Sequence, residues 1–388
     1  MNGPDAPLCI LDVTKYYGDT TGGVRTYLDQ KSAWISRHPP HRHVLAVPAE
    51  RSAVHESGAV RRHELAGPRI PTQPPYRFLL SAAALRRIVL REAPDLIEIG
   101  SPFLVPWVVR EAIRGLDLPL TWFYHGNVPR LISRRPDGEG RVRGVRHRAA
   151  WTYVRAVSRL VRATFAASDF VAAELEREGV ANVRRVRLGV DLDRFTPARR
   201  GSREAVRAAR GLPRGALAIF AGRLAREKHL DVVLRGWEPV ERETGAALAI
   251  VGDGPSREWL RRRPGAERVH WLPFERDRDA LADLLAAADL YIAPGPSETF
   301  GLAALEALAS GTPVLSVASG GVPELVTRSG AGAVYPVGDA PALAAAAVRL
   351  LQGDLAALGR LARAYAEREH DWDGVFADLF AIYHSLAR

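Results

Sequence analysis

Residues 292–326 read IAPGPSETFGLAALEALASGTPVLSVASGGVPELV, and this stretch decides the fold of the second half of the chain. Two short apolar runs, residues 290–293 and 313–317, have the length and composition of buried parallel strands. Each run is followed by a turn of small residues and then by a helix-like spacing of apolar residues. The stretch therefore predicts the strand–turn–helix repeat of a parallel α/β sheet.

Two glutamates stand at the first of these helices, Glu298 just before it and Glu306 within it, with seven residues between them. A helix beginning near Phe300 directs its first backbone N–H groups at the preceding turn, which favours a phosphate there, and Gly301 keeps the approach open. A carboxylate repels an anion, so the glutamates are expected to face neutral hydroxyl groups such as those of a sugar and a ribose. The segment therefore predicts a nucleotide-sugar site.

The alternative for these glutamates is an ordinary solvated helix. Acidic residues near a helix start complement the helix dipole, and a glutamate in mid-helix usually faces water. Glu306, however, is flanked by Ala304, Leu305, Ala307 and Leu308, so the helix is apolar on nearly every side. Because a carboxylate in such surroundings needs a partner or a ligand, the pattern favours a site.

Further motifs occur in a fixed order along the chain. They are GGVRTYLDQ (22–30), LGVDLDRFTP (188–197), AGRLAREKHLDVVL (221–234), VGDGP (251–255) and SETFGLAALEALASGTPVL (297–315). Together they resemble the retaining glycosyltransferase family 4, whose signature is Glu-x7-Glu, and the resemblance runs from about residue 8 to the end of the chain. KYYGDTTGGVRTYL and FYHGNVP are similar to the subgroup that contains phosphatidylinositol-type mannosyltransferases.

The resemblance implies the GT-B fold, an α/β architecture of two Rossmann-like doubly wound domains facing a central cleft. Residues 1–190 would form the acceptor-binding domain, 191–365 the nucleotide-sugar-binding domain, and 366–388 a C-terminal helix that packs back on the first domain. The implied activity is a retaining hexosyltransferase, with mannose or glucose favoured. The donor would be a nucleoside diphosphate sugar, GDP- or UDP-linked, and the acceptor a hydroxyl group on a lipid, glycan or small molecule.

The same resemblance assigns roles to single residues. Arg223 and Lys228 would hold the diphosphate and stabilise the departing nucleotide, Glu306 would bind the ribose, and Glu298 with His125 would contact the hexose. A structural histidine at a strand end and a solvated lysine on a loop are the alternatives for His125 and Lys228. The residues expected to act in the transfer are His125, Glu298, Arg223 and Lys228; those expected to bind the donor are Gly22, Gly23, Arg223, Lys228, Gly252, Glu298, Thr299, Phe300, Gly301, Leu302 and Glu306.

The lysine content supports the assignment of Lys228. The chain has three lysines, Lys15, Lys31 and Lys228, against 51 arginines, and Lys228 is the only one in the second half. A compact ammonium suits a point contact to a diphosphate, whereas the guanidinium of Arg223 offers a bidentate fork.

The expected chemistry needs neither a cofactor nor a metal. Glycosidases place two carboxylates across the scissile bond, but both glutamates here would lie on the donor side, which favours a front-face substitution assisted by the leaving phosphate. Asp191-Leu192-Asp193 has the spacing of a metal-binding pair, but it falls in the segment between the domains and is interpreted as structural. Base recognition is expected near residues 270–274, largely through backbone groups, so the base stays undetermined.

Composition sets the broad class. A chain of 388 residues is long enough for two domains with full cores, and its single cysteine, Cys9, excludes intramolecular disulfides and is expected to be buried. No signal segment and no apolar run near 18 residues is found, so the expected location is cytoplasmic, with contact at the inner membrane face as an option.

The excess of basic over acidic residues belongs entirely to the first half. Residues 1–190 contain 29 basic and 18 acidic residues, and the remainder contains 25 and 26. Ten arginines lie within residues 130–162, where Trp151, Val154 and Val157 recur at helical spacing. Two interpretations stay open: a helix lying on an anionic membrane surface, or a core-facing helix with a solvated basic face. Nucleic acid is not expected, because no DNA- or RNA-binding motif accompanies the arginines.

Strand and helix patterns alternate along the whole chain. Strands are expected at residues 8–13, 43–47, 96–99, 120–124 and 163–166, and a second series begins at 216–220 and 247–251. Helices are expected near 24–36, where Gly22 and Gly23 open the helix so that their amides can approach the diphosphate or the acceptor, and near 372–386. Glu98, at the end of one strand, is expected either to orient a polar acceptor or to face nearby arginines.

Other functions share this fold. A nucleotide-sugar epimerase or a phosphorylase would use a similar two-domain shell, and a non-catalytic nucleotide-sugar-binding or membrane-scaffold protein could keep the fold without the chemistry. The presence of Glu298, Glu306, Arg223 and Lys228 together argues against the non-catalytic alternative.

Overall fold

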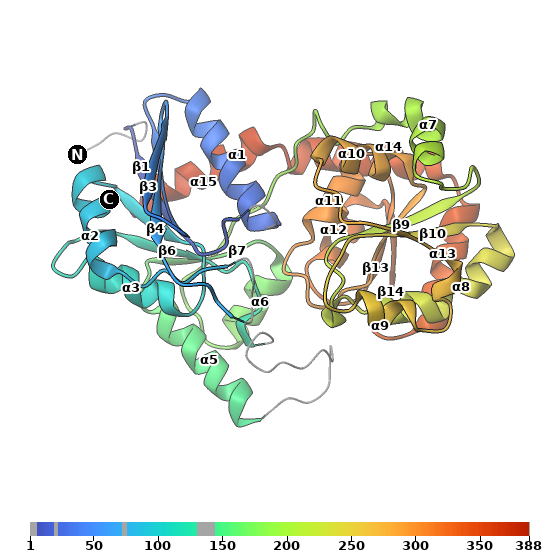
Figure 1. The fold of residues 1–388 in the computed structure, drawn as a ribbon, viewed down its shortest axis with the longest axis horizontal. Coiled ribbons are helices and arrows are strands. Elements are labelled where there is room, and N and C mark those ends of the chain that lie inside the picture. The colour runs from blue at the N-terminus through green and yellow to red at the C-terminus, as the bar shows by residue number, and fades with distance from the viewer. Residues whose placement is uncertain (1–5, 19–21, 72–75, 130–143, 388) are drawn as a thin grey trace. The chain divides into compact units, whose positions relative to one another are not determined.

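The computed structural model describes residues 6–18, 22–71, 76–129 and 144–387. Within these ranges the chain forms two compact units, each an α/β sandwich around its own sheet (Figure 1). The described residues up to Leu188 and those from Trp372 onward form the first unit, and Gly189–Asp371 form the second. The first unit is therefore built from two separated parts of the sequence.

The sheet of the first unit has the strand order β3-β4-β2-β1-β5-β6-β7-β8 among the described residues. All neighbouring strands are parallel except β3 and β4, which form an antiparallel pair at the edge. The strands are β1 (Cys9–Val13), β2 (Arg42–Ala49), β3 (Ala53–Ser57), β4 (Val60–Ala66), β5 (Leu96–Ile99), β6 (Leu120–Phe123), β7 (Ala163–Ala166) and β8 (Val183–Arg185). Cys9 is buried in β1, as expected.

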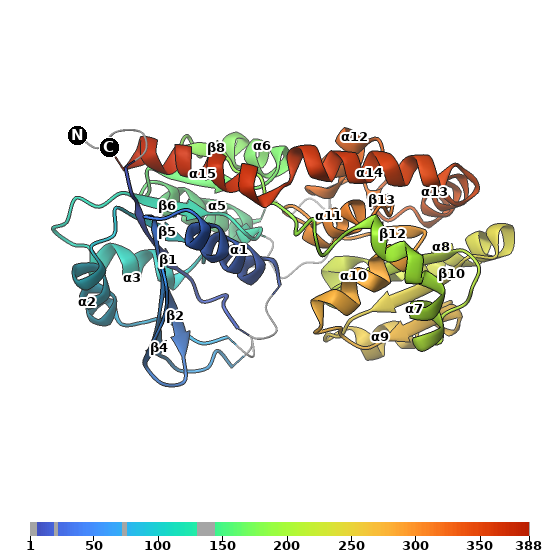
Figure 2. The ribbon, with the colours of Figure 1, turned by 90° about the horizontal axis from the view of Figure 1, so that it is seen from above.

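Six helices cover this sheet in the described part of the unit. They are α1 (Gly23–Arg37), α2 (Ala82–Glu92), α3 (Leu104–Ala112), α5 (Val145–Ser158), α6 (Asp169–Arg177) and α15 (Trp372–Leu386). The terminal helix α15 packs against α1, as predicted, and Figure 2 shows the two helices in the first unit. Aromatic rings line this contact: Trp34 lies 4.7 Å from Phe380 and Tyr27 lies 5.9 Å from Phe376, centroid to centroid.

The second unit has a parallel sheet in the order β11-β10-β9-β12-β13-β14. Its strands are β9 (Leu217–Ala221), β10 (Ala247–Val251), β11 (Val269–Leu272), β12 (Leu290–Ala293), β13 (Val314–Val317) and β14 (Gly332–Tyr335). The helices are η1 (Pro197–Ser202), α7 (Arg203–Ala209), η2 (Arg226–Lys228), α8 (Leu230–Thr244), α9 (Arg257–Arg261), η3 (Ala266–Arg268), α10 (Arg278–Ala287), α11 (Leu302–Ala309), α12 (Val322–Ser329), α13 (Ala340–Gln352) and α14 (Leu355–Glu369). The centre strands are apolar and buried, as the continuous apolar runs predicted.

The described part of the arginine-rich region contains helix α5, which packs its apolar face inside the first unit. Trp151, Val154 and Val157 of α5 are 2%, 0% and 0% exposed, so the apolar face is covered by the protein itself. Arg146 and Arg148 of the same helix are exposed. This burial corrects the interpretation in which that apolar face enters lipid; the amphipathic spacing is the same for both cases, so the sequence alone did not separate them. Five of the ten arginines, Arg130, Arg134, Arg135, Arg141 and Arg143, lie outside the described residues.

Among the helices that the structure describes, none is by itself long and apolar enough to cross a membrane. Helices α13 and α14 pass that test only as a pair, and they are bent by 99° at their junction.

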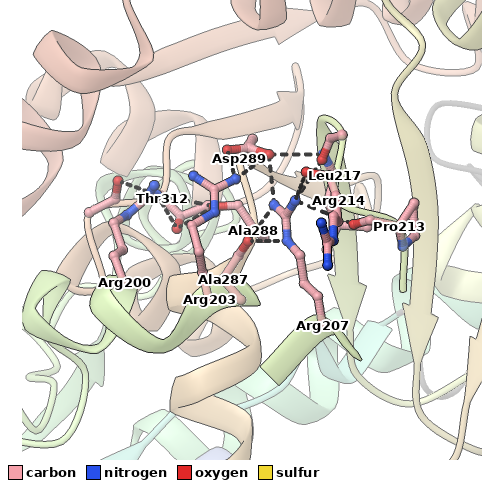
Figure 3. Close-up of polar contacts among 12 residues, drawn as sticks. Arg200, Arg203, Arg207, Pro213, Arg214, Leu217, Ala287, Ala288, Asp289 and Thr312 are labelled. Atoms are coloured by element: carbon pink, nitrogen blue, oxygen red, sulfur yellow. Dashed lines mark hydrogen bonds and ion pairs between the residues drawn. The ribbon is translucent and has the colours of Figure 1, made fainter. Parts of the chain in front are cut away.

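A cluster of arginines ties together the amino-terminal ends of β9 and β12 (Figure 3). Arg207 is 1% exposed, and its guanidinium donates to Asp289 Oδ2 at 2.8 Å and to the carbonyls of Ala287, Arg214 and Gly215. Asp289 also accepts from the backbone N–H of Leu217 at 2.9 Å. The cluster therefore satisfies the buried polar groups at the start of both strands.

Candidate functional sites at the sheet edges

The carboxyl end of β12 leads into the motif with the two glutamates. Helix α11 begins at Leu302, two residues later than expected, because Gly301 precedes it in the left-handed region with φ of 98°. A Cβ atom at Gly301 would collide with the side chain of Val322, so both the backbone angle and the close packing require glycine. The helix start is thus set by Gly301, and the first N–H groups of α11 are directed at the turn before it.

Glu298 lies in this turn and forms an ion pair with Lys228, whose ammonium donates to Glu298 Oε1. Gly295 lies beside the pair: a Cβ there would stand 3.4 Å from Lys228 Cδ and 3.6 Å from Glu298 Oε1. The carbonyl of Glu298 accepts from the N–H of Gly321 at 2.8 Å, which anchors the turn on the loop before α12. The structure therefore brings together two predicted residues that come from η2 and from the turn after β12.

Glu306 is 5% exposed on α11, and the guanidinium of Arg278 donates to its Oε1 at 2.5 Å. Burial raises the pKa of Glu306, and the charge of Arg278 opposes that rise. The second carboxylate oxygen accepts no hydrogen bond from any residue that the structure describes. A ribose hydroxyl can bind there without displacing Arg278.

Arg278 was not predicted as part of the site. It begins α10 and lies over the ring of Phe195, 5.0 Å from the ring centroid. The sequence contained only an indirect indication of this residue. A glutamate in an apolar helix needs a partner, but the sequence did not indicate which of the many arginines is that partner.

The ends of β9 and β10 approach each other closely. A Cβ at Gly252, where φ is 146°, would collide with the carbonyl of Gly222, so this turn requires glycine. Arg223 is the residue after Gly222. It is exposed, and its guanidinium makes no hydrogen bond or ion pair with the described parts of the chain. An exposed guanidinium at a strand end is available to an anion.

The remaining predicted donor residues surround the start of α11. Thr299 and Leu302 are half-buried, and Phe300 is buried with its ring 5.7 Å from that of His370. The structure thus gives Phe300 a packing role, and only its backbone is left to serve a ligand.

The Asp191-Leu192-Asp193 segment has a structural role. Asp191 accepts from the backbone N–H of Arg194 at 3.0 Å and from its guanidinium at 2.8 Å, which closes a turn. No group of three or more His, Cys, Asp or Glu side chains suited to a metal ion occurs among the described residues.

In the first unit, Gly22 is the N-cap of α1 and Gly23 its first residue, as predicted. A Cβ at Gly22 would meet no atom of the described residues within 4 Å. Tyr27, one turn along α1, places its ring 5.6 Å from that of His125, which connects the helix to the end of β6.

His125 follows β6 and stacks on the ring of Phe123, with centroids 4.1 Å apart and planes 3° from parallel. Burial, together with the positive charge of Lys31, lowers the pKa of His125 to about 3. The imidazole is therefore neutral at physiological pH. A neutral imidazole carries one donor and one acceptor nitrogen, which suits hydrogen bonding to sugar hydroxyls.

We expect His125 to stay neutral throughout the working range of the protein. Its imidazole NMR signals should not shift with pH between 5 and 8. As the pH falls below about 6.5, the unfolded chain takes up a proton on this histidine, whereas the folded protein does not until the pH approaches 3. The stability of the folded protein therefore declines as the pH falls from about 6.5 toward 3. A titration of His125 near neutral pH would contradict this description.

Beneath this edge lies a buried ionic cluster that was not predicted. Lys31 donates to Asp12 Oδ2 at 2.9 Å, to Glu98 Oε1 at 3.0 Å and to the hydroxyl of Tyr383 at 2.9 Å. Glu98 also accepts from the hydroxyl of Tyr27 at 3.0 Å, and burial raises the pKa of Glu98 to about 7. Glu98 is fully buried, so it neither faces arginines nor orients an acceptor, and both expectations for it are wrong.

The sequence matches two family descriptions that together span both units. "Glycosyltransferase Family 4" matches residues 21–194, and "Glycosyl transferases group 1" matches residues 215–353. A GDP-mannose-dependent alpha-(1-6)-phosphatidylinositol dimannoside mannosyltransferase of Mycobacterium tuberculosis is 33% identical over 326 residues, which cover 82% of this chain and 81% of that protein. A D-inositol 3-phosphate glycosyltransferase of Saccharomonospora viridis is 38% identical over 218 residues, 52% of this chain and 49% of that protein.

Solved structures of low sequence identity share the architecture. Sucrose-phosphate synthase from Thermosynechococcus elongatus superposes with a TM-score of 0.79 at 21% identity, covering 98% of this chain and 99% of that chain. WaaG, a glycosyltransferase involved in lipopolysaccharide biosynthesis, gives a TM-score of 0.71 at 17% identity, with 97% and 99% covered. At these identities the likeness concerns the fold, and it confirms the expected GT-B class.

Proposed function

The chain belongs to glycosyltransferase family 4, and from that membership we propose that it is a retaining hexosyltransferase that moves mannose from GDP-mannose to an acceptor hydroxyl. The observation that carries the proposal is the pairing of Glu298 with Lys228 beside the glycine-bounded start of α11. A carboxylate that can accept sugar hydroxyls and an ammonium that can bind phosphate thus stand side by side.

The residues have distinct proposed roles. Arg223 and Lys228 bind the diphosphate and stabilise the charge that develops on it as it departs. Glu306 accepts a ribose hydroxyl through the oxygen that Arg278 leaves open, and Glu298 accepts hydroxyls of the hexose. His125, neutral in its stacked position, contacts the sugar near the anomeric carbon.

The proposed reaction is a front-face substitution. The acceptor oxygen forms a bond to the anomeric carbon on the face from which the phosphate leaves, and the bond between that carbon and the phosphate oxygen breaks. The proton of the acceptor hydroxyl passes to the departing phosphate oxygen, so configuration is retained and no enzyme nucleophile is needed. In this proposal the basic groups at the diphosphate replace a metal ion.

The choice of mannose and GDP rests on the relative from M. tuberculosis, whose name gives GDP-mannose as its donor. Glucose and UDP are the second option that the family resemblance leaves open. The relatives also include a sulfoquinovosyl transferase from Arabidopsis thaliana and D-inositol 3-phosphate glycosyltransferases, whose names give no nucleotide. These relatives are less identical or cover less of the chain, and they therefore weigh less.

Calorimetric titration of the whole protein with GDP, UDP and ADP, in buffer containing EDTA, tests the donor site. We expect micromolar affinity for GDP and at least about tenfold weaker binding of UDP and ADP, since a nucleotide that leaves buried polar groups unpaired loses affinity. Affinity that appears only with added Mg²⁺ would contradict the metal-independent mechanism.

The same titration separates the proposal from its alternatives. If none of the three nucleotides binds, the non-catalytic interpretation takes precedence. If GDP binds, release of GDP from GDP-mannose only in the presence of an acceptor distinguishes transfer from epimerisation.

The cellular location stays a prediction. A cytoplasmic protein that touches the anionic inner face of a membrane is compatible with the excess of arginine in residues 1–190. Leu104 and Trp107 of α3 are exposed large apolar residues, and Arg110 lies over the ring of Trp107. If the membrane is contacted, we propose this part of the first unit rather than the buried face of α5.

A further inference from the structure

The buried ionic cluster beneath the edge of the first sheet sets one ammonium against two carboxylates. Lys31 lies 2.9 Å from Asp12 Oδ2 and 3.0 Å from Glu98 Oε1, and all three side chains are buried. His43 lies 2.7 Å from Asp12 Oδ2, but burial lowers the pKa of His43, so its imidazole adds no positive charge near neutral pH. Because apolar side chains of the same volume are often at least as stable as a buried ion pair, stability alone does not account for the cluster.

The two carboxylate oxygens of Glu98 serve different neighbours. Oε1 accepts from the ammonium of Lys31 and, at 3.0 Å, from the hydroxyl of Tyr27, whereas Oε2 accepts from the hydroxyl of Tyr383 at 2.6 Å. Tyr27 precedes Lys31 by one turn of α1, and the ammonium also lies over the Tyr27 ring, 4.6 Å from its centroid. The cluster therefore holds Tyr27 both at its hydroxyl and on the face of its ring.

The ring of Tyr27 reaches from this cluster to His125. It meets Phe123 with centroids 5.0 Å apart and His125 with centroids 5.6 Å apart, in both cases edge to face. Those two rings are stacked on each other, so Tyr27 closes one side of the pair. Gly100 also lies close to the imidazole, since a Cβ there would stand 3.9 Å from His125 Nε2. A displacement of Tyr27 would therefore change the angle of the imidazole.

We propose that Glu98 and Lys31, acting through Tyr27, position His125 and thereby fix the angle at which its imidazole meets the hexose of the donor. They are positioning residues, because they act on the sugar only through His125. Groups that bind a substrate must be held within about 0.5 Å of the productive geometry, and hydrogen bonds from buried neighbours provide this support. The inference rests on the proposed function, since it assumes that His125 contacts the hexose.

The charge of Lys31 supports the same arrangement. Burial and the charge of Lys31 both lower the pKa of His125, and the charge of Asp12 opposes them. The neutral imidazole keeps one donor and one acceptor nitrogen. The cluster therefore acts on the orientation of His125 by contact and on its protonation state by charge.

The alternative is that the cluster only docks the terminal helix α15 on the first unit. In that case the hydroxyls of Tyr27 and Tyr383 are equivalent, because each donates one hydrogen bond to Glu98. Removal of either hydroxyl leaves the other carboxylate oxygen with its own donor. The two tyrosines are therefore a matched pair, one packed against His125 and one on the terminal helix.

The test measures the binding of GDP-mannose and of GDP by calorimetry on the whole protein. Tyr27→Phe should weaken GDP-mannose by about threefold or more and leave GDP unchanged, because in the proposal His125 contacts the sugar and not the nucleotide. Tyr383→Phe, the matched control, should leave both affinities unchanged, although the melting temperatures of the two variants should fall by similar amounts. His125→Ala is the reference and should weaken GDP-mannose by about tenfold.

Glu98→Met tests whether the carboxylate acts through Tyr27. This variant removes the acceptor of the Tyr27 hydroxyl, while Lys31 keeps Asp12 as its counter-charge. It should weaken GDP-mannose as much as Tyr27→Phe does, and the double variant should bind no more weakly than either single variant.

A second readout needs no ligand and stays available if Glu98→Met does not fold. The imidazole NMR signal of His125 is identified by its absence from the spectrum of His125→Ala. In the free protein this signal should move in Tyr27→Phe and stay in place in Tyr383→Phe.

The inference is overturned if Tyr27→Phe binds GDP-mannose as the wild-type protein does while His125→Ala binds it more weakly. It is also overturned if Tyr383→Phe weakens GDP-mannose as strongly as Tyr27→Phe, or if Tyr27→Phe weakens GDP to the same degree, since a general loosening would then explain the result. If the wild-type protein does not bind GDP-mannose, or if His125→Ala binds it normally, it is the proposed function that fails. The NMR comparison then still decides whether Tyr27 holds the imidazole, so the two failures are distinguished.

Discussion

Replacing Glu298 by glutamine is expected to lower kcat by about 100-fold or more, with little change in folding. The carboxylate accepts hydroxyl hydrogens and balances the ammonium of Lys228, whereas the amide of glutamine carries no charge and presents only one acceptor oxygen. Stability should be nearly unchanged, because both side chains of the ion pair are partly exposed and such pairs contribute at most about 1 kcal/mol.

The measurement is the initial rate of GDP release from GDP-mannose with an acceptor, together with the melting temperature of each variant. Glu227→Gln is the matched control, since Glu227 is an exposed carboxylate next to Lys228 in the sequence. Unchanged turnover of Glu298→Gln would remove Glu298 from the catalytic site. Equal losses in both variants would indicate a general effect of charge on the loop.

Replacing Arg207 by methionine is expected to destabilise the second unit by about 3–5 kcal/mol. Methionine can fill the space of the side-chain stem, but the carbonyls of Ala287, Arg214 and Gly215 would lose their donor inside the protein, and Asp289 would lose one of its two arginines (Figure 3). The buried carbonyl of Ala287, left without a donor, costs about 1–3 kcal/mol, whereas those of Arg214 and Gly215 belong to exposed residues and can bind water instead.

Urea unfolding followed by tryptophan fluorescence measures this loss. Arg214→Met is the control, because Arg214 is exposed and contributes only its carbonyl to the cluster. A change below about 0.5 kcal/mol in Arg207→Met would mean that water or a neighbouring arginine replaces the guanidinium, contrary to the expected result.

The helices and strands that could be predicted are those whose pattern of apolar residues shows which side chains are buried. The apolar runs of β5, β7, β10 and β12 gave strands with the predicted bounds, and the apolar face of α15 gave the terminal helix. Strands β3 and β4 were not predicted, because they form an edge pair with few buried side chains and therefore lack a continuous apolar run. The start of α11 was misplaced by two residues, since the backbone angle of Gly301 depends on its packing against Val322.

The site was predicted less completely than the fold. Local motifs indicated Glu298, Glu306 and Lys228, but the contacts of Glu306 with Arg278 and of Lys31 with Glu98 join residues 28 and 67 positions apart. Among 51 arginines, spacing alone does not indicate which one meets a given carboxylate. Glu98 illustrates the limit: its strand was predicted, yet the buried lysine beside it comes from another element.

The discontinuity of the first unit has a consequence for biosynthesis. Tyr383 of α15 completes the polar cluster around Lys31, and Phe376 and Phe380 cover the aromatic face of α1. A ribosome that has translated residues 1–188 has not yet produced these side chains, so the nascent first unit would expose that face to water. The second unit is complete at Asp371, before α15 is made. The half of the protein that is translated later is thus expected to finish folding first, and the sheet that is translated first needs protection from aggregation until the last helix emerges.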